Sequence, residues 1–159
     1  MVLLSVKAGL RAGEIARVTW DMVLDPSGEI ASVIELYDNI AKKKSGRLIP
    51  MHPDLRAALA DWKCRTDCRG TVIKSERKGP MASPSIVNWF ATAYRRLHLN
   101  GCSSHSGRRA FVTRAARLVH QAGGSLRDVQ LLAGHRSILT TQRYIDGDTD
   151  AQRRLVAML

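Results

Sequence analysis

The spacing of apolar and polar residues along the chain predicts short helices, interrupted near the N-terminus by a pair of strands. The apolar run Val2–Val6 indicates the end of a buried helix, and Gly9 marks the point where that helix stops. A second helical piece is expected from Glu14 to about Trp20. The N-terminal region is therefore expected to hold two helical pieces with Arg11 at the bend between them.

A β-hairpin is expected after these two pieces. Asp25–Gly28 has the composition of a turn, and Glu29–Leu36 is rich in Ile and Val, as is typical of a strand. The basic segment Ala41–Gly46 forms the next turn, and Arg47–Pro50 returns as the second strand. A further short strand is expected at Thr71–Ile73.

Helical spacing dominates the rest of the chain. Ser83 is expected to cap one helix because Pro84 follows it, and Ser125 with Asp128 forms a capping-box pattern before another. The expected helices are Pro53–Trp62, one from Ser83 to about Leu97, Ser104–Gln121, one that follows Ser125, Ser137–Ile145 and Asp150–Leu159. Their expected inward faces include Ile86, Phe90, Ala93 and Leu97, then Phe111, Ala115 and Leu118, then Leu126, Val129 and Leu132.

The chain length and composition favour a single domain. Its 159 residues, 45% of them hydrophobic, are enough for one compact core and few for two. There are no internal repeats and no low-complexity tracts. The predicted fold class is α+β, mostly helical, with a small antiparallel β-sheet near the N-terminus, and residues 1–159 form one domain.

The charge balance changes the functional picture. The chain has 25 Lys and Arg against 14 Asp and Glu, a formal net charge of +11. A small domain this basic usually faces a polyanion such as DNA, RNA or an anionic membrane surface, although a soluble protein can also be merely basic. Arginine dominates the C-terminal half, and its planar guanidinium binds phosphate in a bidentate way that lysine cannot.

Cysteine and hydropathy patterns bound the location and the cofactors. An odd count of three cysteines suits a reducing cytoplasm, and Cys64 and Cys68 lack nearby partners for a metal site. No apolar stretch reaches the length of a membrane span, and Met1–Leu10 lacks the marks of a signal peptide. We therefore expect a cytoplasmic protein without a metal, and a chain that begins within a larger domain.

Two basic segments in the first third of the chain suit phosphate chemistry. Arg11 lies in a glycine-bounded bend at a helix terminus, although it could equally be a surface arginine paired with Glu14. Lys42, Lys43 and Lys44 lie at the hairpin tip, where they can reach a DNA groove or backbone. A solvated lysine turn that only maintains solubility is the alternative.

Two later segments also suit phosphate chemistry: one holds a histidine and an arginine, the other a histidine and a tyrosine. His105 and Arg108 share one helical face, where the arginine can bind two phosphate oxygens and the histidine can exchange a proton. His135 follows Gly134, and Tyr144 comes nine residues later. Taken singly, each of these residues is more often structural or solvent-exposed than catalytic.

In order and spacing, the four segments together resemble the tyrosine recombinase family, which includes phage integrases and the bacterial recombinases that resolve chromosome dimers. The family pattern is Gly-Leu-Arg-x-x-Glu, a hairpin lysine some eight residues before a proline, His-x-x-Arg, Gly-His, and a tyrosine nine residues on. The matching positions are Arg11, Lys42, His105, Arg108, His135 and Tyr144. The resemblance runs from Leu4 to about Ile145, with Gly107 as a departure that removes a core side chain and adds flexibility.

The resemblance implies DNA cutting and rejoining through a 3′-phosphotyrosine at Tyr144, with no cofactor. Arg11 and Arg108 would hold the non-bridging phosphate oxygens, with a hydrogen bond from His135. His105 is then the candidate to take the proton from Tyr144. Lys42, or a neighbour in the lysine run, is the candidate to protonate the leaving 5′-oxygen.

The resemblance also implies partners. Double-stranded DNA is the expected ligand, bound in part by Lys43, Lys44, Arg109, Thr141 and Arg143. A tetramer on DNA in a bacterial or phage-infected cell is expected, with the segment Ala151–Leu159 packed on another protomer. The family's N-terminal DNA-clamping domain is expected to be missing from this chain.

Three other interpretations stay open from the sequence. A type IB topoisomerase shares the phosphotyrosine chemistry. A truncated or decayed integrase would use the same basic face to bind DNA without cutting it. A basic helical module that binds proteins would explain the charge but not the motifs.

Overall fold

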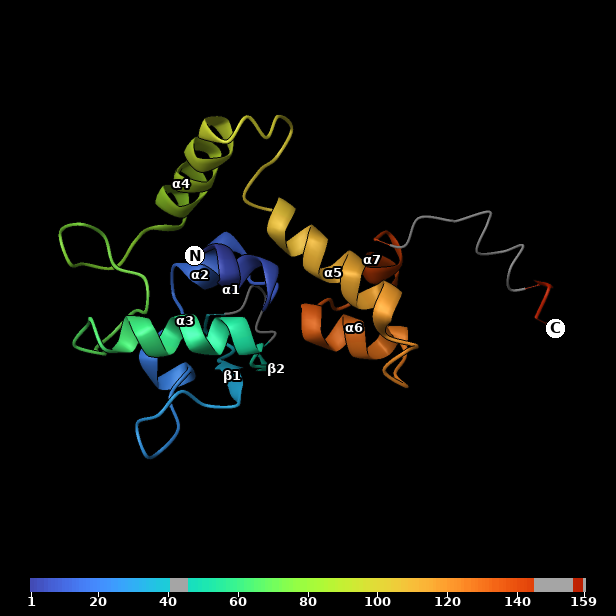
Figure 1. The fold of residues 1–159 in the computed structure, drawn as a ribbon, viewed down its shortest axis with the longest axis horizontal. Coiled ribbons are helices and arrows are strands. Elements are labelled where there is room, and N and C mark those ends of the chain that lie inside the picture. Colours follow the sequence, from blue (N-terminus) through green and yellow to red (C-terminus); the bar gives the residue numbers. More distant parts are fainter. Residues whose placement is uncertain (41–45, 145–155, 159) are drawn as a thin grey trace.

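The computed structural model describes residues 1–40, 46–144 and 156–158, and it confirms an α+β, mostly helical fold (Figure 1). Its elements, in order, are α1 (Val2–Val6), α2 (Ala12–Ile15), the 3-10 helix η1 (Trp20–Met22), β1 (Val33–Leu36), β2 (Arg47–Pro50), α3 (Pro53–Lys63), α4 (Ser83–Arg96), α5 (Ser106–Leu118), α6 (Leu126–Ala133) and α7 (Ile138–Gln142). No helix among these described residues is long and apolar enough to cross a membrane.

The predicted hairpin is present, with a shorter first strand. β1 and β2 pair antiparallel, and Leu36 lies opposite Arg47 at one end of the ladder. β2 has the predicted bounds, whereas β1 starts later than predicted because Ile30 pairs with Leu24 in an isolated bridge. The predicted turn Ala41–Gly46, with its three lysines, lies outside the described residues apart from Gly46.

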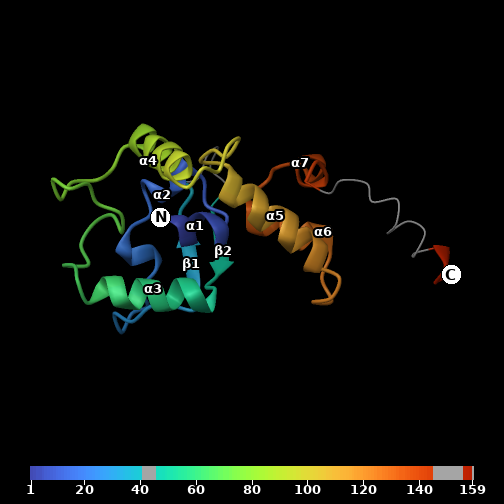
Figure 2. The ribbon, with the colours of Figure 1, turned by 45° about the horizontal axis from the view of Figure 1, so that its top comes forward.

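Buried apolar side chains form two separate clusters. The larger cluster draws on α1 to α4 and the hairpin, with Leu10, Trp20 and Phe90 among its members. The smaller cluster lies between α5 and α6, around Val112 and Val129. Figures 1 and 2 show the same division, with α5, α6 and α7 grouped on one side of the remaining elements.

Two glycines allow the two parts to meet closely, because α1 packs against α5. Gly9 has a left-handed backbone with φ of +64°, and a Cβ there would overlap the Phe111 ring. A Cβ at Gly107 would overlap the Ser5 hydroxyl in the same way. This gives a packing reason for Gly107, since this glycine lies where α5 touches α1.

Several element boundaries in the structure differ from the predicted ones. The second helical piece ends at Ile15 rather than near Trp20, and Thr71–Ile73 contributes only an isolated bridge from Thr71 to Thr19. α4 begins at Ser83 itself, with Ala82 as its N-cap. The capping box at the start of α6 is confirmed, because Asp128 accepts hydrogen bonds from the backbone and hydroxyl of Ser125.

The predicted inward faces of α4 and α6 were right at their centres, whereas that of α5 was displaced by one residue. Ile86 and Phe90 are buried, but Leu97 is exposed just after α4. In α5 the buried residues are Val112 and Ala116, while the predicted Phe111 and Ala115 are half-buried and Leu118 is exposed. The predicted helix at 150–159 lies almost wholly outside the described residues.

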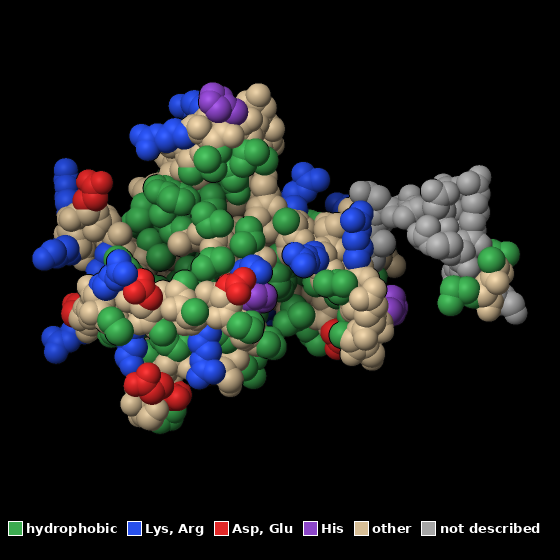
Figure 3. Space-filling view, in the orientation of Figure 1, with side chains coloured by type: hydrophobic (Ala, Val, Ile, Leu, Met, Phe, Trp, Pro, Cys, Tyr) green, Lys and Arg blue, Asp and Glu red, His purple; other side chains and the backbone are tan. Residues whose placement is uncertain are grey.

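An apolar hollow separates α4 from the elements beneath it. Its volume is about 480 Å³, and Val2, Leu59, Trp62 and Trp89 are among the residues that line it. Figure 3 shows the same gathering of apolar side chains, with lysines and arginines spread around the outline of this face. None of the residues predicted for phosphate chemistry lines this hollow.

Candidate active site

A buried carboxylate organises the N-terminal side of the site. Arg11 is the N-cap of α2, and the side chain of Glu14, three residues later, is only 1% exposed. Glu14 accepts a hydrogen bond of 2.8 Å from the Arg11 backbone N–H and one of 2.9 Å from Arg11 Nη1. The local pair between these residues is therefore real, but it is buried rather than a surface pair.

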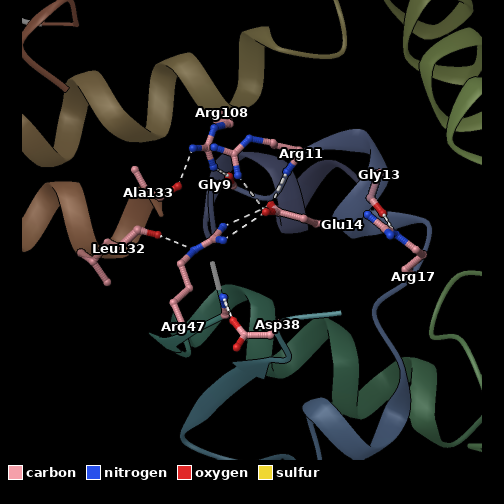
Figure 4. Close-up of polar contacts among 11 residues, drawn as sticks. Gly9, Arg11, Gly13, Glu14, Arg17, Asp38, Arg47, Arg108, Leu132 and Ala133 are labelled. Carbon is pink, nitrogen blue, oxygen red and sulfur yellow. Dashed lines mark hydrogen bonds and ion pairs between the residues drawn. The ribbon is translucent and has the colours of Figure 1, made fainter. Parts of the chain in front are cut away.

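A second arginine, absent from the predicted site residues, completes this cluster. Arg47 Nη1 and Nη2 donate to the two carboxylate oxygens of Glu14 at 3.0 and 3.1 Å. Its Nε donates to the Leu132 carbonyl oxygen at 2.9 Å, which ties β2 to the end of α6 (Figure 4). The sequence indicates only that a buried carboxylate needs a cationic partner, a need that Arg11 already meets, so no local signal points to Arg47.

The same cluster contains Arg108, which extends from α5. Arg108 is 3% exposed and donates to the carbonyl oxygens of Gly9 and Ala133 (Figure 4). Burial, and then the positive charge of Arg11, lower the pKa of Arg108 to about 10. Arg108 therefore remains charged at neutral pH.

The balance of charge in this cluster is positive. Burial alone would raise the pKa of Glu14, but hydrogen bonds and charge from Arg47 and Arg11 hold its pKa below the usual value. Glu14 is therefore ionised at neutral pH and provides one negative charge among three guanidinium groups. A buried excess of positive charge favours binding of an anion such as phosphate.

His135 joins the cluster from the turn after α6. Gly134 has φ of +61° and ends the helix, and the buried imidazole that follows lies 3.0 Å from Thr141 Oγ1 through its Nδ1. Gln130 Nε2 donates to the His135 carbonyl oxygen at 2.8 Å. Burial, followed by the charge of Arg108, lowers the pKa of His135 to about 4, so that the imidazole is neutral at pH 7.

Tyr144 lies next to this histidine. Its ring stacks on the imidazole of His135 with ring centroids 5.6 Å apart and an interplanar angle of 21°. The side chain is half-buried, and the Thr113 hydroxyl donates to the Tyr144 carbonyl oxygen at 3.5 Å. The phenol is therefore placed at the edge of the arginine cluster, near enough to influence the pKa of Arg108.

The other predicted site residues lie in three different situations. His105 is exposed at the N-cap of α5, with no side-chain hydrogen bond to any described residue. Arg109 and Arg143 are exposed, as a contact with DNA would require. Thr141 is fully buried against His135, so its predicted role as a DNA contact is not what this structure supports. Lys42, Lys43 and Lys44 are outside the described residues.

Together, these residues define a class of site. Three arginines around one carboxylate can hold a phosphate group, and a neutral histidine can add a hydrogen bond. A tyrosine beside them supplies a hydroxyl that can act as a nucleophile. The arrangement can therefore bind an anion such as phosphate beside a potential oxygen nucleophile.

The comparison with protein families identifies the family to which the chain belongs. The model of the phage integrase family matches residues 1–150. This chain belongs to the phage integrase family.

Individual relatives agree with this assignment. Tyrosine recombinase XerC of Brucella suis biovar 1 (strain 1330) is 28% identical over 146 residues, which cover 89% of this chain and 43% of the relative. The chain thus spans less than half the length of this curated relative.

Two solved structures share the fold. The Tn1549 transposon integrase has a TM-score of 0.75 and 20% identity, covering 99% of this chain and 57% of that one. XerA recombinase has a TM-score of 0.73 and 22% identity, with coverage of 99% and 56%.

Proposed function

We propose that this chain is the catalytic part of a site-specific DNA recombinase, which cuts and rejoins double-stranded DNA through a 3′-phosphotyrosine at Tyr144. The observation that carries the proposal is the convergence of four predicted residues in one place. Arg11, Arg108, His135 and Tyr144 come from separate segments, yet they meet where the two hydrophobic clusters adjoin. The Tn1549 integrase was solved in complex with a circular intermediate DNA, which supports DNA as the ligand.

The proposed cutting step is a displacement at phosphorus. The Tyr144 hydroxyl oxygen bonds to phosphorus as the bond to the 5′-oxygen breaks, and the phenol proton passes to a base. Arg11 and Arg108 stabilise the charge on the non-bridging oxygens, and neutral His135 donates a hydrogen bond from Nε2. Rejoining is the reverse attack by a 5′-hydroxyl, so the phosphotyrosine conserves the bond energy and no nucleotide cofactor is needed.

The proton transfers fall to residues outside the buried cluster. We assign the base for Tyr144 to His105, which lies at the start of α5 three residues before Arg108. Its exposed position leaves it accessible to bound DNA. We assign protonation of the leaving 5′-oxygen to Lys42 or to a neighbour in the lysine run.

The proposed DNA surface surrounds this site. Arg109 and Arg143 are exposed near Arg108 and Tyr144 in sequence, and Lys43 and Lys44 follow Lys42 directly in the sequence. Because such residues neutralise phosphates, binding should weaken steeply as salt rises. We also propose self-association into a tetramer on DNA.

Trapping of a covalent adduct tests the proposal. The protein is mixed with nicked duplexes of randomised sequence, and SDS-resistant protein–DNA adducts are isolated and mapped. Tyr37→Phe is the matched control, because Tyr37 is exposed and its hydroxyl lies beside Asp21, which is not among the site residues. We expect adducts with the unmodified protein and Tyr37→Phe, and none with Tyr144→Phe. Adducts that persist in Tyr144→Phe, or no adduct with the unmodified protein, would overturn the proposal.

A further inference from the structure

Two arginines bridge the same pair of segments. Arg108 joins the Gly9 carbonyl to the Ala133 carbonyl, and Arg47 joins the Glu14 carboxylate to the Leu132 carbonyl. One segment belongs to the larger hydrophobic cluster and the other to the smaller cluster. Arg108 belongs to the family motif, whereas nothing in the proposed chemistry uses Arg47.

Arg47 and Arg11 share one carboxylate unequally. Arg47 binds both oxygens of Glu14 and is 6% exposed, while Arg11 makes a single guanidinium bond to Glu14 and is 22% exposed. Within the part of the chain that the structure describes, Glu14 is the only acceptor for the Arg11 guanidinium. Most of its N–H donors are therefore available to a ligand.

Without Arg47, this balance would change. A buried carboxylate needs a charged partner, and Arg11 would be the cation left within reach. A bidentate pair between Arg11 and Glu14 would use the planar edge of the guanidinium that a phosphate requires. The charge of Arg11 would then be neutralised by a protein carboxylate.

We propose that Arg47 is a positioning residue for phosphate binding. It neutralises Glu14 so that Arg11 keeps its donors for the phosphate, and it holds the Leu132 carbonyl so that the turn carrying His135 stays next to Arg11. This role rests on the recombinase function proposed above. It is a role for arginine specifically, since one planar fork places Nε on Leu132 and two Nη atoms on Glu14, which the single ammonium of lysine cannot do.

Gly134 supports the same inference from a second direction. A Cβ at Gly134 would lie 2.8 Å from Arg47 Nη1 and 3.1 Å from Arg47 Cδ. The Arg47 side chain thus passes directly over the backbone between Ala133 and His135. Movement of this arginine would therefore be transmitted to the histidine turn.

The experiment compares cleavage and DNA affinity in four variants: Arg47→Gln, Arg47→Lys, the double variant Arg47→Gln with Glu14→Gln, and Arg17→Gln as control. Arg17 is a fair control because it also donates to main-chain carbonyls, those of Gly13 and Asn39, but it is exposed. We expect Arg47→Gln and Arg47→Lys to lower the rate of adduct formation about 10- to 100-fold, with DNA affinity nearly unchanged. The control should cleave at the rate of the unmodified protein.

The double variant separates positioning from simple loss of structure. If Arg47 acts by neutralising Glu14, removing the carboxylate as well should restore adduct formation about tenfold over Arg47→Gln. A purely structural role predicts a further loss instead. Circular dichroism and thermal unfolding of each variant identify those that fail to fold, and Arg47→Lys, which keeps the charge, is the milder substitution.

A second readout does not depend on cleavage. Phenylglyoxal modifies accessible arginines, and peptide mapping reports its reaction at Arg11 relative to exposed Arg109. We expect Arg11 to react several-fold less in Arg47→Gln than in the unmodified protein. Unchanged reaction at Arg11, or no rescue in the double variant, would overturn the proposal. If the unmodified protein forms no adduct, the recombinase function fails, and the phenylglyoxal reaction still decides whether Arg47 keeps Arg11 available.

Discussion

The aromatic ring of Tyr144 stacks on the imidazole of His135, with their centroids 5.6 Å apart. The two residues flank α7, and the hydroxyl of Thr141, within that helix, contacts the Nδ1 atom of His135 at 3.0 Å. One short helix therefore positions both the candidate nucleophile and the candidate phosphate ligand. This arrangement makes Thr141 a buried residue that supports the imidazole of His135.

Replacing Thr141 should weaken catalysis more than folding. In Thr141→Val the imidazole loses the partner that orients its Nδ1, so we expect adduct formation to slow about 10- to 100-fold. Thr140→Val is the matched control, because Thr140 is the preceding residue of α7 and is exposed. Thr141→Ser keeps the hydroxyl and should retain most of the rate. Equal rates for the two valine variants would contradict this assignment.

Neutralising Glu14 should destabilise the fold. Glu14→Gln leaves the guanidinium groups of Arg11 and Arg47 close together without their counter-charge, and we expect a loss of about 3 kcal/mol in the free energy of unfolding. Urea denaturation measures it. The control is Glu29→Gln, which removes an exposed ion pair with Lys63 and should cost far less, because solvent screens that pair. A similar small loss for both variants would show that the buried cluster contributes little.

Stability should rise with pH between about 4 and 6.5. Burial and the neighbouring arginines lower the pKa of His135 from its ordinary value of 6.5 to about 4, so the unfolded chain binds a proton there that the folded chain does not. The stabilisation is present above pH 6.5 and is lost as pH falls through 4, and it amounts to at most about 3 kcal/mol.

Thermal unfolding across this range checks the pH prediction. His135→Gln removes the titrating group and should flatten the rise, while His98→Gln, at an exposed position, should leave the rise unchanged. Burial, followed by the charges of Arg108, Arg11 and Arg47, depresses the pKa of the His135 imidazole, so the effect should disappear with the imidazole itself. An equally steep rise in His135→Gln would assign the effect to other groups.

Gly107 should not tolerate even one added methyl group. A Cβ at this position overlaps the Ser5 hydroxyl where α5 crosses α1, and we expect Gly107→Ala to cost about 1–3 kcal/mol in unfolding free energy. Gly79→Ala is the control, because the nearest atom to a Cβ there is Ser75 Oγ at 4.0 Å. Chemical denaturation of both variants measures the difference. A neutral Gly107→Ala would mean that α1 and α5 can separate at little cost.

Local patterns predicted most of the elements because their causes are local. The capping box of Ser125 and Asp128 depends on residues three apart, and β2 pairs with the strand just before it in the sequence; both were predicted correctly. The predicted length of the second helical piece was wrong because η1 forms separately, with the Trp20 backbone N–H bonded to the Gly70 carbonyl across the fold. The prediction that Leu97 is buried was wrong, because helical spacing predicts an apolar face without showing whether another element covers it.

The sequence by itself determined the α+β class and the order of the Arg11, Arg108, His135 and Tyr144 segments, since helix caps, strand patterns and motif spacing are written along the chain. Only the tertiary structure decided how charge is balanced in the site. Arg47 is 33 residues from Glu14 and 85 from Leu132, and a separation along the chain specifies no distance in space. The packing of β2 against α6 places the Arg47 guanidinium beside the Glu14 carboxylate. With Glu14 paired to Arg47, the Arg11 guanidinium is left open to a ligand.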